Sequence, residues 1–217
     1  MMKETVRFRF SSVLAAIVVY WAVTPLLQGF FGLVVLTDLF FSAVLISAIW
    51  AVAQIPRQAA VAAGLALPML VSLWLLHFGP RPVLLLIGSV FEVLFFGYTA
   101  WLILSAVIKA PAISREIIAA AIVVYMFLGL IWAGLYSVLE LLQPGSFLIH
   151  GAVAGPTSRH FAYFSYTTLT TLGYGDITPI SGSARALSTL EALIGQIYLA
   201  VLIARLVGIH AAQGSGE

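Results

Sequence analysis

The sequence predicts an all-α integral membrane protein with six transmembrane helices, a short re-entrant helix and an extended segment that follows it. Hydrophobic residues make up 62% of the 217 positions and charged residues only 8%, and the mean hydropathy is +1.11. A soluble domain has about 25% charged residues, so this composition belongs in lipid. One segment rich in threonine and glycine interrupts the apolar stretches near the C-terminus.

Six apolar stretches have the length of about 20 residues that a helix needs to cross a hydrocarbon core of about 30 Å. They lie at about 10–29, 33–54, 58–78, 82–108, 116–142 and 185–209. Glycine and proline separate them, as at Pro56 and Pro111. The first stretch follows a basic N-terminus but is longer than the roughly 7–15 apolar residues of a signal peptide, so we expect a retained membrane helix.

The basic residues predict that both termini are cytoplasmic, because lysine and arginine accumulate on that side of a membrane. The cytoplasmic set is Lys3, Arg7, Arg9, Arg57, Lys109, Arg115 and Arg205, and the external set is Arg81, Arg159 and Arg185. With no organelle address in the sequence, we expect a plasma membrane, that of a prokaryotic cell. Scattered basic residues predict no nucleic-acid partner.

Residues 143–184 form the one long connection, and the orientation places it outside. Its first half, rich in glycine, proline, serine and histidine, predicts a loop. The run "FAYFSYTTLTT" that follows is too short to span, so we expect a re-entrant helix at 159–170 that returns through Gly173 and Gly175. Non-helical backbone survives at membrane depth only where protein buries it or where it lines a water-filled path. The segment 171–176 is therefore a candidate pore or substrate site.

The residue types of this segment suit a dehydrated monovalent cation. Gly173 and Gly175 can adopt positive φ, which lets successive carbonyl groups point the same way and replace a water shell. The Thr171 hydroxyl adds an oxygen ligand, and Asp176 adds negative charge at the outer mouth. The C-terminal dipole of the re-entrant helix also favours a cation. These features alone do not select potassium.

The run Thr171–Asp176, "TLGYGD", resembles the T-V-G-Y-G-D signature of potassium channels, with Leu172 in place of valine. The likeness extends over "FAYFSYTTLTTLGYGDITP", and the specific resemblance covers about 115–209; the first four stretches resemble the six-helix, voltage-gated-type channels in arrangement only. The resemblance implies K⁺ ions in a selectivity filter, held by the carbonyls of Thr171, Leu172, Gly173, Tyr174 and Gly175 and by the Thr171 hydroxyl. It also implies a four-helix bundle at 1–110 and a pore domain at 111–217, with pore helix 159–170, filter 171–176 and inner helix 185–209.

Three further positions take expected roles from the same resemblance. Tyr163 is expected to hold Asp176 through a hydrogen bond, with simple aromatic packing as the alternative. Glu140 is expected to bind backbone amides near the loop between filter and inner helix. Thr167 stands where some channels carry a buried glutamate, so we expect no proton-sharing pair between this position and Asp176.

The last span offers a hinge and a cavity lining. Gly195 lies near the place of the family's gating glycine, and it predicts either a hinge or close helix packing. The stripe of Ala192, Gln196, Leu199, Ala200 and Ile203 has helical spacing. We expect this stripe to face a central cavity, with Gln196 as its polar member; the alternative is packing against the fifth span.

Four more ionisable residues are candidates. Glu92 and Glu191 lie mid-span, where a carboxylate costs about 2.5–3.5 kcal/mol, so each must be paired, protonated or facing water. For Glu92 we favour a hydrogen-bonded structural carboxyl over a proton sensor. His150 and His160 have the chemistry to sense external pH, although most surface histidines have no such role.

Two familiar gating inputs are missing from the sequence. No lysine or arginine lies between Pro82 and Ala106, so the fourth span is not an arginine-based voltage sensor. The short tail after the last span predicts no cytoplasmic ligand-binding domain on this chain.

The expected assembly is a homotetramer in the lipid bilayer, because the chain holds one filter segment and a potassium filter needs four. The expected function is passive conduction of K⁺, with no organic cofactor. The alternatives are a non-conducting or accessory channel-like subunit and a potassium transporter component. An enzyme is disfavoured, because no H-E-x-x-H or nucleophile-elbow pattern is present.

Overall fold

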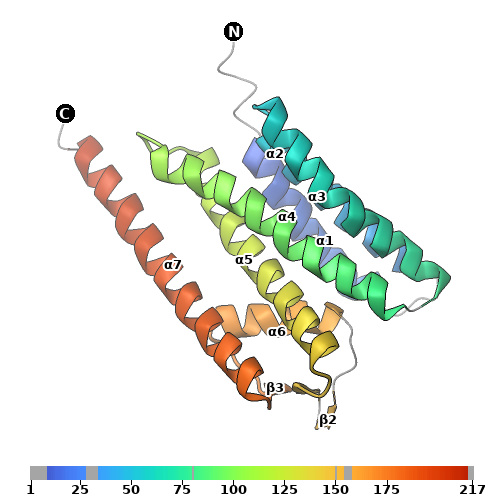
Figure 1. Cartoon of the computed structure of the whole chain (residues 1–217). Helices are drawn as coiled ribbons and strands as arrows, with labels where there is room; N and C mark the ends of the chain where they lie inside the picture. Colours follow the sequence, from blue (N-terminus) through green and yellow to red (C-terminus); the bar gives the residue numbers. More distant parts are fainter. Residues whose placement is uncertain (1–8, 28–33, 80, 150, 154–157, 215–217) are drawn as a thin grey trace.

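The structure is a computed structural model that describes residues 9–27, 34–79, 81–149, 151–153 and 158–214. In these ranges the chain forms seven α-helices, one short 3₁₀ turn and three short strands (Figure 1). The helical class is confirmed, and the strands are an addition to the predicted all-α fold.

The first five helices pack side by side as an antiparallel bundle (Figure 1). They are α1 (Arg9–Leu27), α2 (Val34–Val52), α3 (Pro56–Leu75), α4 (Pro82–Lys109) and α5 (Arg115–Leu142), with the 3₁₀ turn η1 (Leu76–Phe78) extending α3. Each helix contacts the next, and α1 also contacts α5, which closes the ring.

The helix starts follow from local chemistry. Pro56 and Pro82 open α3 and α4, where proline loses nothing because the first N–H groups of a helix have no partner within it. Ser114 caps α5, since its hydroxyl oxygen accepts the backbone N–H of Ile117 at 3.3 Å.

Among the described residues, five helices are long and apolar enough to cross a membrane, where the sequence predicts six spans. The five segments are Val35–Val52, Pro56–Phe78, Pro82–Lys109, Arg115–Leu142 and Gly182–Gly208. In α1 the apolar part is Phe10–Thr24, which as a helix reaches roughly 22 Å and falls short of a hydrocarbon core of about 30 Å. The predicted end of the first span at 29 and start of the second at 33 lie outside the described residues.

Two helices complete the chain. The short α6 (Ser158–Leu169) crosses the lower end of α5 and α7 in Figure 1 and contacts both. Its bounds agree within one residue with the helix predicted at 159–170. The last helix, α7 (Gly182–Gly214), begins three residues before the predicted span and continues five residues beyond it.

A three-stranded antiparallel sheet stands where the sequence predicts loop. Its strands are β1 (Phe147–Ile149), β2 (Ala152–Val153) and β3 (Ile177–Pro179), in the order β2-β1-β3. Gly151, with φ of 81°, lies in the turn between β1 and β2. The glycine and proline residues on both sides of this short apolar run favour a loop, so a strand of only three residues was not predicted. The pairing of Phe147 with Pro179 and of Ile149 with Ile177 joins this hairpin to the chain that follows segment 171–176.

Two apolar cores share α5. The larger lies among α1 to α5 and includes the α5 residues from Ala119 to Leu130. The smaller is aromatic and surrounds Tyr136, with Phe147, Phe161 and Phe164 at ring-centroid distances of 5.4, 6.3 and 5.1 Å. One helix thus packs against both the first four helices and α6. The domain limits at 110 and 111 stay a prediction.

Polar contacts at one end of the bundle join helix termini that are distant in sequence. The Glu116 carboxylate accepts the backbone N–H groups of Phe10 at 3.0 Å and Ser11 at 3.3 Å, at the start of α1. The Arg205 guanidinium donates to the carbonyl oxygens of Val107 at 3.3 Å and Ala110 at 3.4 Å, at the end of α4. The start of α1 and the C-terminal end of α7 therefore lie at the same end of the molecule, opposite the sheet (Figure 1).

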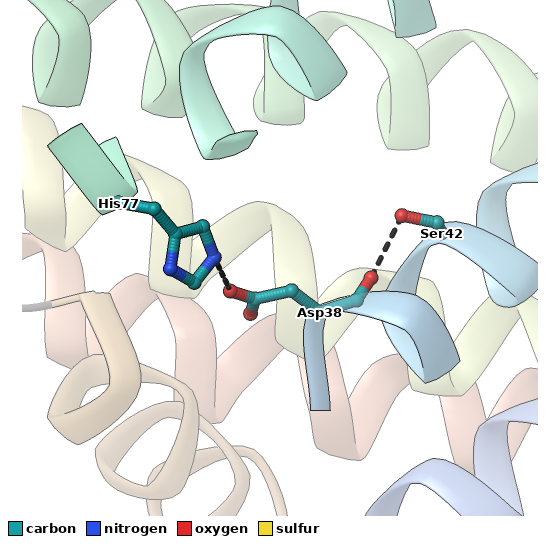
Figure 2. Close-up of polar contacts among 3 residues, drawn as sticks. All are labelled: Asp38, Ser42 and His77. Carbon is teal, nitrogen blue, oxygen red and sulfur yellow. Dashed lines mark hydrogen bonds and ion pairs between the residues drawn. The ribbon is translucent and has the colours of Figure 1, made fainter. Parts of the chain in front are cut away.

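At the opposite end, the side chains of Asp38 and His77 form a hydrogen-bonded pair that the sequence did not suggest. The His77 Nε2 lies 2.9 Å from Asp38 Oδ2, and the Ser42 hydroxyl donates to the Asp38 backbone oxygen at 2.7 Å (Figure 2). Asp38 is buried, and a buried carboxylate needs such a partner. The pair joins the first turns of α2 to η1 across 39 positions of sequence.

The contact between α5 and α6 yields a stability prediction at Gly129. A Cβ at this position would lie 2.4 Å from Tyr166 Cε1, and that ring is held by a hydrogen bond to the Met126 oxygen at 2.6 Å and by edge contact with Trp21 at 4.7 Å. Gly129→Ala should lower the free energy of unfolding by about 1–3 kcal/mol through overpacking. Thermal unfolding in detergent, followed by tryptophan fluorescence, measures the change.

The matched control is Gly97→Ala in α4, where an added Cβ meets nothing within 4 Å. That change should leave stability unchanged or raise it by up to about 1 kcal/mol, because alanine favours helix. Equal effects at the two glycines would contradict the packing argument.

Candidate functional site

The C-terminal end of α6 fixes the start of segment 171–176 by backbone hydrogen bonds. The N–H groups of Leu172 and Gly173 both donate to the Thr167 oxygen, at 2.8 and 3.1 Å, and the Thr171 N–H donates to the Thr168 oxygen at 2.9 Å. The helix-end carbonyls, which have no partner within the helix, are satisfied in this way. The amide groups are thereby turned towards α6. Among the described residues, no protein donor reaches the carbonyl oxygens of 171–175.

Every second residue of the segment has positive φ. The values are 60° at Thr171, 54° at Gly173 and 79° at Gly175, so the positive φ predicted for both glycines is confirmed. The positive φ of Thr171 was not predicted. A β-branched residue with positive φ stores strain of order 1–3 kcal/mol. Such outliers cluster at functional sites. The alternation of negative and positive φ indicates that the backbone of 171–175 is held in one defined conformation.

The same residues are exposed on the isolated chain. Leu172 is 54% exposed and Tyr174 68% exposed, although both are large and belong to a chain built for lipid. A segment with free carbonyl groups cannot face hydrocarbon. Its uncovered side therefore requires either water or another protein surface.

Asp176 closes the segment beside Tyr163 of α6. A hydrogen bond from the Tyr163 hydroxyl to the Asp176 carboxylate raises the pKa of that tyrosine. The backbone N–H of Ile177 donates to Asp176 Oδ1 at 3.1 Å. The structure thus brings together the two residues that the resemblance pairs.

Glu140 binds backbone amides as expected, but these amides belong to the turn after α5 and not to the loop between the filter segment and α7. Its carboxylate accepts the N–H groups of Gly145 at 2.7 Å, Ser146 at 2.9 Å and Phe147 at 3.2 Å. These residues follow α5 and not the filter, because the chain turns back over the carboxylate at Gly145, whose φ is 83°. The Ser146 oxygen in turn accepts the N–H of Ile180 at 2.9 Å. Glu140 therefore reaches the segment before α7 through the β1 backbone.

Gly195 lies where α7 touches the end of α6. A Cβ at this position would lie 2.6 Å from the Leu169 oxygen, which also accepts the Tyr125 hydroxyl at 3.1 Å. The helix is continuous from Gly182 to Gly214. Of the two interpretations of this glycine, close packing has direct geometric support.

The other predicted cavity residues are uncovered in the single chain. Gln196, Ala200 and Ile203 are exposed, whereas Ala192 and Leu199 are half-buried. Ile203 is 59% exposed, so packing against α5 does not account for the whole stripe. A cavity-lining role stays a prediction.

Glu191 belongs to a buried network that sequence reasoning did not find. Its carboxyl group contacts the Tyr136 hydroxyl of α5 at 2.5 Å and the Ser165 hydroxyl of α6. The sequence showed only that a mid-span carboxyl needs a partner, because these partners lie 55 and 26 positions away. Thr167, by contrast, donates its hydroxyl to the Phe164 oxygen at 2.9 Å within α6. The buried carboxyl group that contacts α6 is therefore that of Glu191 in α7, and not a residue at position 167.

The remaining candidates lie apart from segment 171–176. Glu92 is half-buried in α4 and faces α5, with its carboxyl carbon 3.7 Å from where a Cβ of Gly134 would stand. His160 is exposed in the first turn of α6. His150 lies outside the described residues. Within the described ranges, no group of three or more His, Cys, Asp or Glu side chains is arranged to hold a metal ion.

The region from α5 to α7 has a counterpart among known families. Residues 117–210 match the family model described as "Ion channel". The C-terminal part of the chain thus resembles an ion channel. The matched region contains most of α5 together with α6, segment 171–176 and most of α7, and it is less than half of the 217 residues. No curated protein and no solved structure matches the chain.

The matched family is one of ion channels and not of enzymes. Together with the five helices of the described residues that are apolar enough to span a bilayer, the match supports a multi-pass membrane protein. The first four helices lie outside the matched residues.

Glu140→Gln tests the turn that Glu140 holds. A carboxylate offers two acceptor oxygens to three N–H groups, whereas an amide offers one and turns its own donors towards the rest. Loss of hydrogen bonds to a buried charged group should cost about 1.5–3 kcal/mol. Hydrogen exchange at the amides of residues 145–147 should become faster.

Amides in α3 serve as the internal control for this variant, because α3 packs against α2 and α4, whereas Glu140 belongs to α5. Unchanged exchange at 145–147 would show that the carboxylate does not hold this turn.

Proposed function

We propose that the protein is a potassium-selective channel that conducts K⁺ passively through a homotetrameric pore, with segment 171–176 as its selectivity filter. The observation that carries the proposal is the backbone of this segment. Positive φ alternates at Thr171, Gly173 and Gly175, and the N–H groups at its start are bonded to α6. The carbonyl oxygens of 171–175 are left as the polar groups available to an ion.

Ion coordination follows from these oxygens. The carbonyls of Thr171, Leu172, Gly173, Tyr174 and Gly175, with the Thr171 hydroxyl, replace the water shell of K⁺ in successive sites. Repulsion between ions in neighbouring sites keeps them moving. The sequence "TLGYGD" supports potassium as the ion by its resemblance to potassium channels. Leu172 changes an apolar side chain and leaves the carbonyl in place.

The proposed assembly has four copies, which is the number that the resemblance to potassium channels implies. One chain supplies one row of oxygens, so an ion stripped of water needs further rows around a common axis. The uncovered surface agrees with this, because only 11% of the apolar span of α7 is buried, against 61% of that of α5. We assign the exposed faces of α7 and of segment 171–175 to contact with three other copies.

Residues around the filter take supporting roles in this proposal. Tyr163 holds Asp176 at the outer mouth, and Glu140 stabilises the turn and sheet that continue into α7. Gln196 and Ile203 line the cavity below the filter, while Gly195 lets α7 approach the end of α6.

The proposed orientation puts the filter outside and the described ends of α1 and α7 in the cytoplasm of the cell, in the plasma membrane. The basic residues support this side assignment. The lack of lysine and arginine between Pro82 and Ala106 means that α4 does not gate the pore as an arginine voltage sensor.

Flux of K⁺ into liposomes that contain the purified protein tests the proposal, with Na⁺ as comparator and Ba²⁺ as blocker. Wild type should show Ba²⁺-blocked flux of K⁺ well above that of Na⁺. Gly173→Ala should reduce flux by at least about tenfold, because alanine resists the φ of 54° that the filter needs. Gly182→Ala, at the start of α7 with nothing within 4 Å of the added Cβ, should leave flux unchanged.

Equal flux of Na⁺ and K⁺ would contradict the proposed selectivity for K⁺. Leu172→Val, which restores the valine of the potassium-channel signature, would then be the first variant to measure. Absence of flux at every voltage and pH, in a protein shown by native mass spectrometry to be tetrameric, would favour the non-conducting or accessory subunit. A monomeric protein that transports K⁺ would favour the transporter component.

A further inference from the structure

Glu191 lies at a point where side chains of α5, α6 and α7 form hydrogen bonds with one another. The residue is completely buried. Its Oε2 is 2.5 Å from the Tyr136 hydroxyl, and its Oε1 contacts the Ser165 hydroxyl. The Ser165 oxygen is also 2.7 Å from the backbone oxygen of Gly129. Four oxygen-bearing groups from three helices therefore form one chain of contacts.

The number of hydrogens in this chain decides which group donates. A serine hydroxyl has one hydrogen, and a backbone carbonyl can only accept. Ser165 can therefore satisfy Gly129 or Glu191, but not both. If Glu191 is ionised, one of the two contacts of Ser165 sets two acceptors against each other. If Glu191 carries a proton on Oε1, it donates to Ser165, Ser165 donates to Gly129, and Tyr136 donates to Oε2, so each hydrogen is used once.

The titratable groups around Glu191 are compatible with a neutral, protonated Glu191. The titratable groups that face Glu191 are Tyr136 and Tyr125 of α5 and Tyr166 of α6, and Tyr166 also interacts with Glu92 of α4. The residues of β3, which also packs against α7, are isoleucine, threonine and proline, which do not titrate here. At the far end of α7, Arg205 contacts the end of α4, away from Glu191.

No cation balances the site within the described residues. The arginines of α7 bind elsewhere, Arg185 to the Pro179 oxygen and Arg205 to the end of α4. A buried carboxylate without a counter-charge is strongly disfavoured, so the group keeps its proton instead.

We propose that Glu191 is a protonated carboxylic acid and the positioning residue that fixes α6 between α5 and α7. Ser165 lies six residues before Thr171, on the helix whose end holds the filter amides. Removal of the proton places two acceptors in contact and releases α6 from either Gly129 or Glu191. Conduction should therefore decline as pH rises. This last consequence rests on the proposed channel function, whereas the protonation itself does not.

Infrared difference spectroscopy tests the protonation without ion flux. The spectrum of wild type minus that of Glu191→Gln should contain the carbonyl stretch of a protonated carboxylic acid, and the band should shift in D₂O. Glu140→Gln is the matched control, because Glu140 accepts three N–H groups and needs no proton, so its difference spectrum should lack the band. Absence of the band from the Glu191 difference overturns the proposal.

Flux tests the positioning role. Glu191→Gln keeps a donor for Ser165 and an acceptor for Tyr136, so it should conduct within about twofold of wild type, whereas Glu191→Ala should lose at least about tenfold through unpaired buried groups. Wild-type flux should fall at alkaline pH, and the glutamine variant should stay flat over the same range. A glutamine variant as impaired as the alanine variant, or a decline with pH identical to that of wild type, contradicts the role. If wild type itself shows no flux, the channel function fails, and the infrared band still decides the state of Glu191.

Discussion

Backbone groups at membrane depth must find partners within the protein, and the rest of this structure depends on how the end of α6 meets that requirement. Its last carbonyl groups receive the N–H groups of Thr171, Leu172 and Gly173. These bonds turn the amides inward and leave the following carbonyls without a protein donor. The backbone then alternates between negative and positive φ, at the expense of strain at Thr171. Such a shape persists only if α6 itself cannot move.

Most of the groups that hold α6 come from α5. Tyr125 donates to the Leu169 oxygen at 3.1 Å, and the Met126 oxygen accepts the Tyr166 hydroxyl at 2.6 Å. Gly129 admits the Tyr166 ring, while Tyr136 anchors the aromatic core and reaches Glu191. The other face of α5 packs in the core of the first four helices. These helices therefore support the filter segment mainly through α5, and α1 adds the edge contact of Trp21 with the Tyr166 ring of α6.

Sequence reasoning succeeded where the signal is local. Length and hydropathy identify five spans, and the aromatic, hydroxylated run identifies α6 within one residue. Glycine spacing predicts the positive φ at Gly173 and Gly175 because that freedom belongs to the residue itself. The motif also points to the contact of Tyr163 with Asp176, through a resemblance and not through a physical derivation.

The features that sequence reasoning missed depend on partners far along the chain. Glu191 meets Tyr136 and Ser165 only after three helices have packed, and no spacing in the sequence encodes that meeting. The pairing of Asp38 with His77 is of the same kind. Thr171 carries no local preference for positive φ, so its conformation is imposed by the bonds on either side. The sheet was missed for another reason, since strands of two or three residues are shorter than any recognisable alternation.

Arg205 gives the molecule a mechanical property at the end opposite the filter. Its guanidinium reaches from α7 to the carbonyl oxygens of Val107, Ile108 and Ala110, where α4 ends and the link to α5 begins. A swing of this end of α7 away from the bundle would take the guanidinium from the oxygens of Ile108 and Ala110, whereas the Val107 oxygen would keep the backbone N–H of Ala110 at 3.3 Å. These contacts therefore couple the tail of α7 to the end of α4, so the two segments should move together.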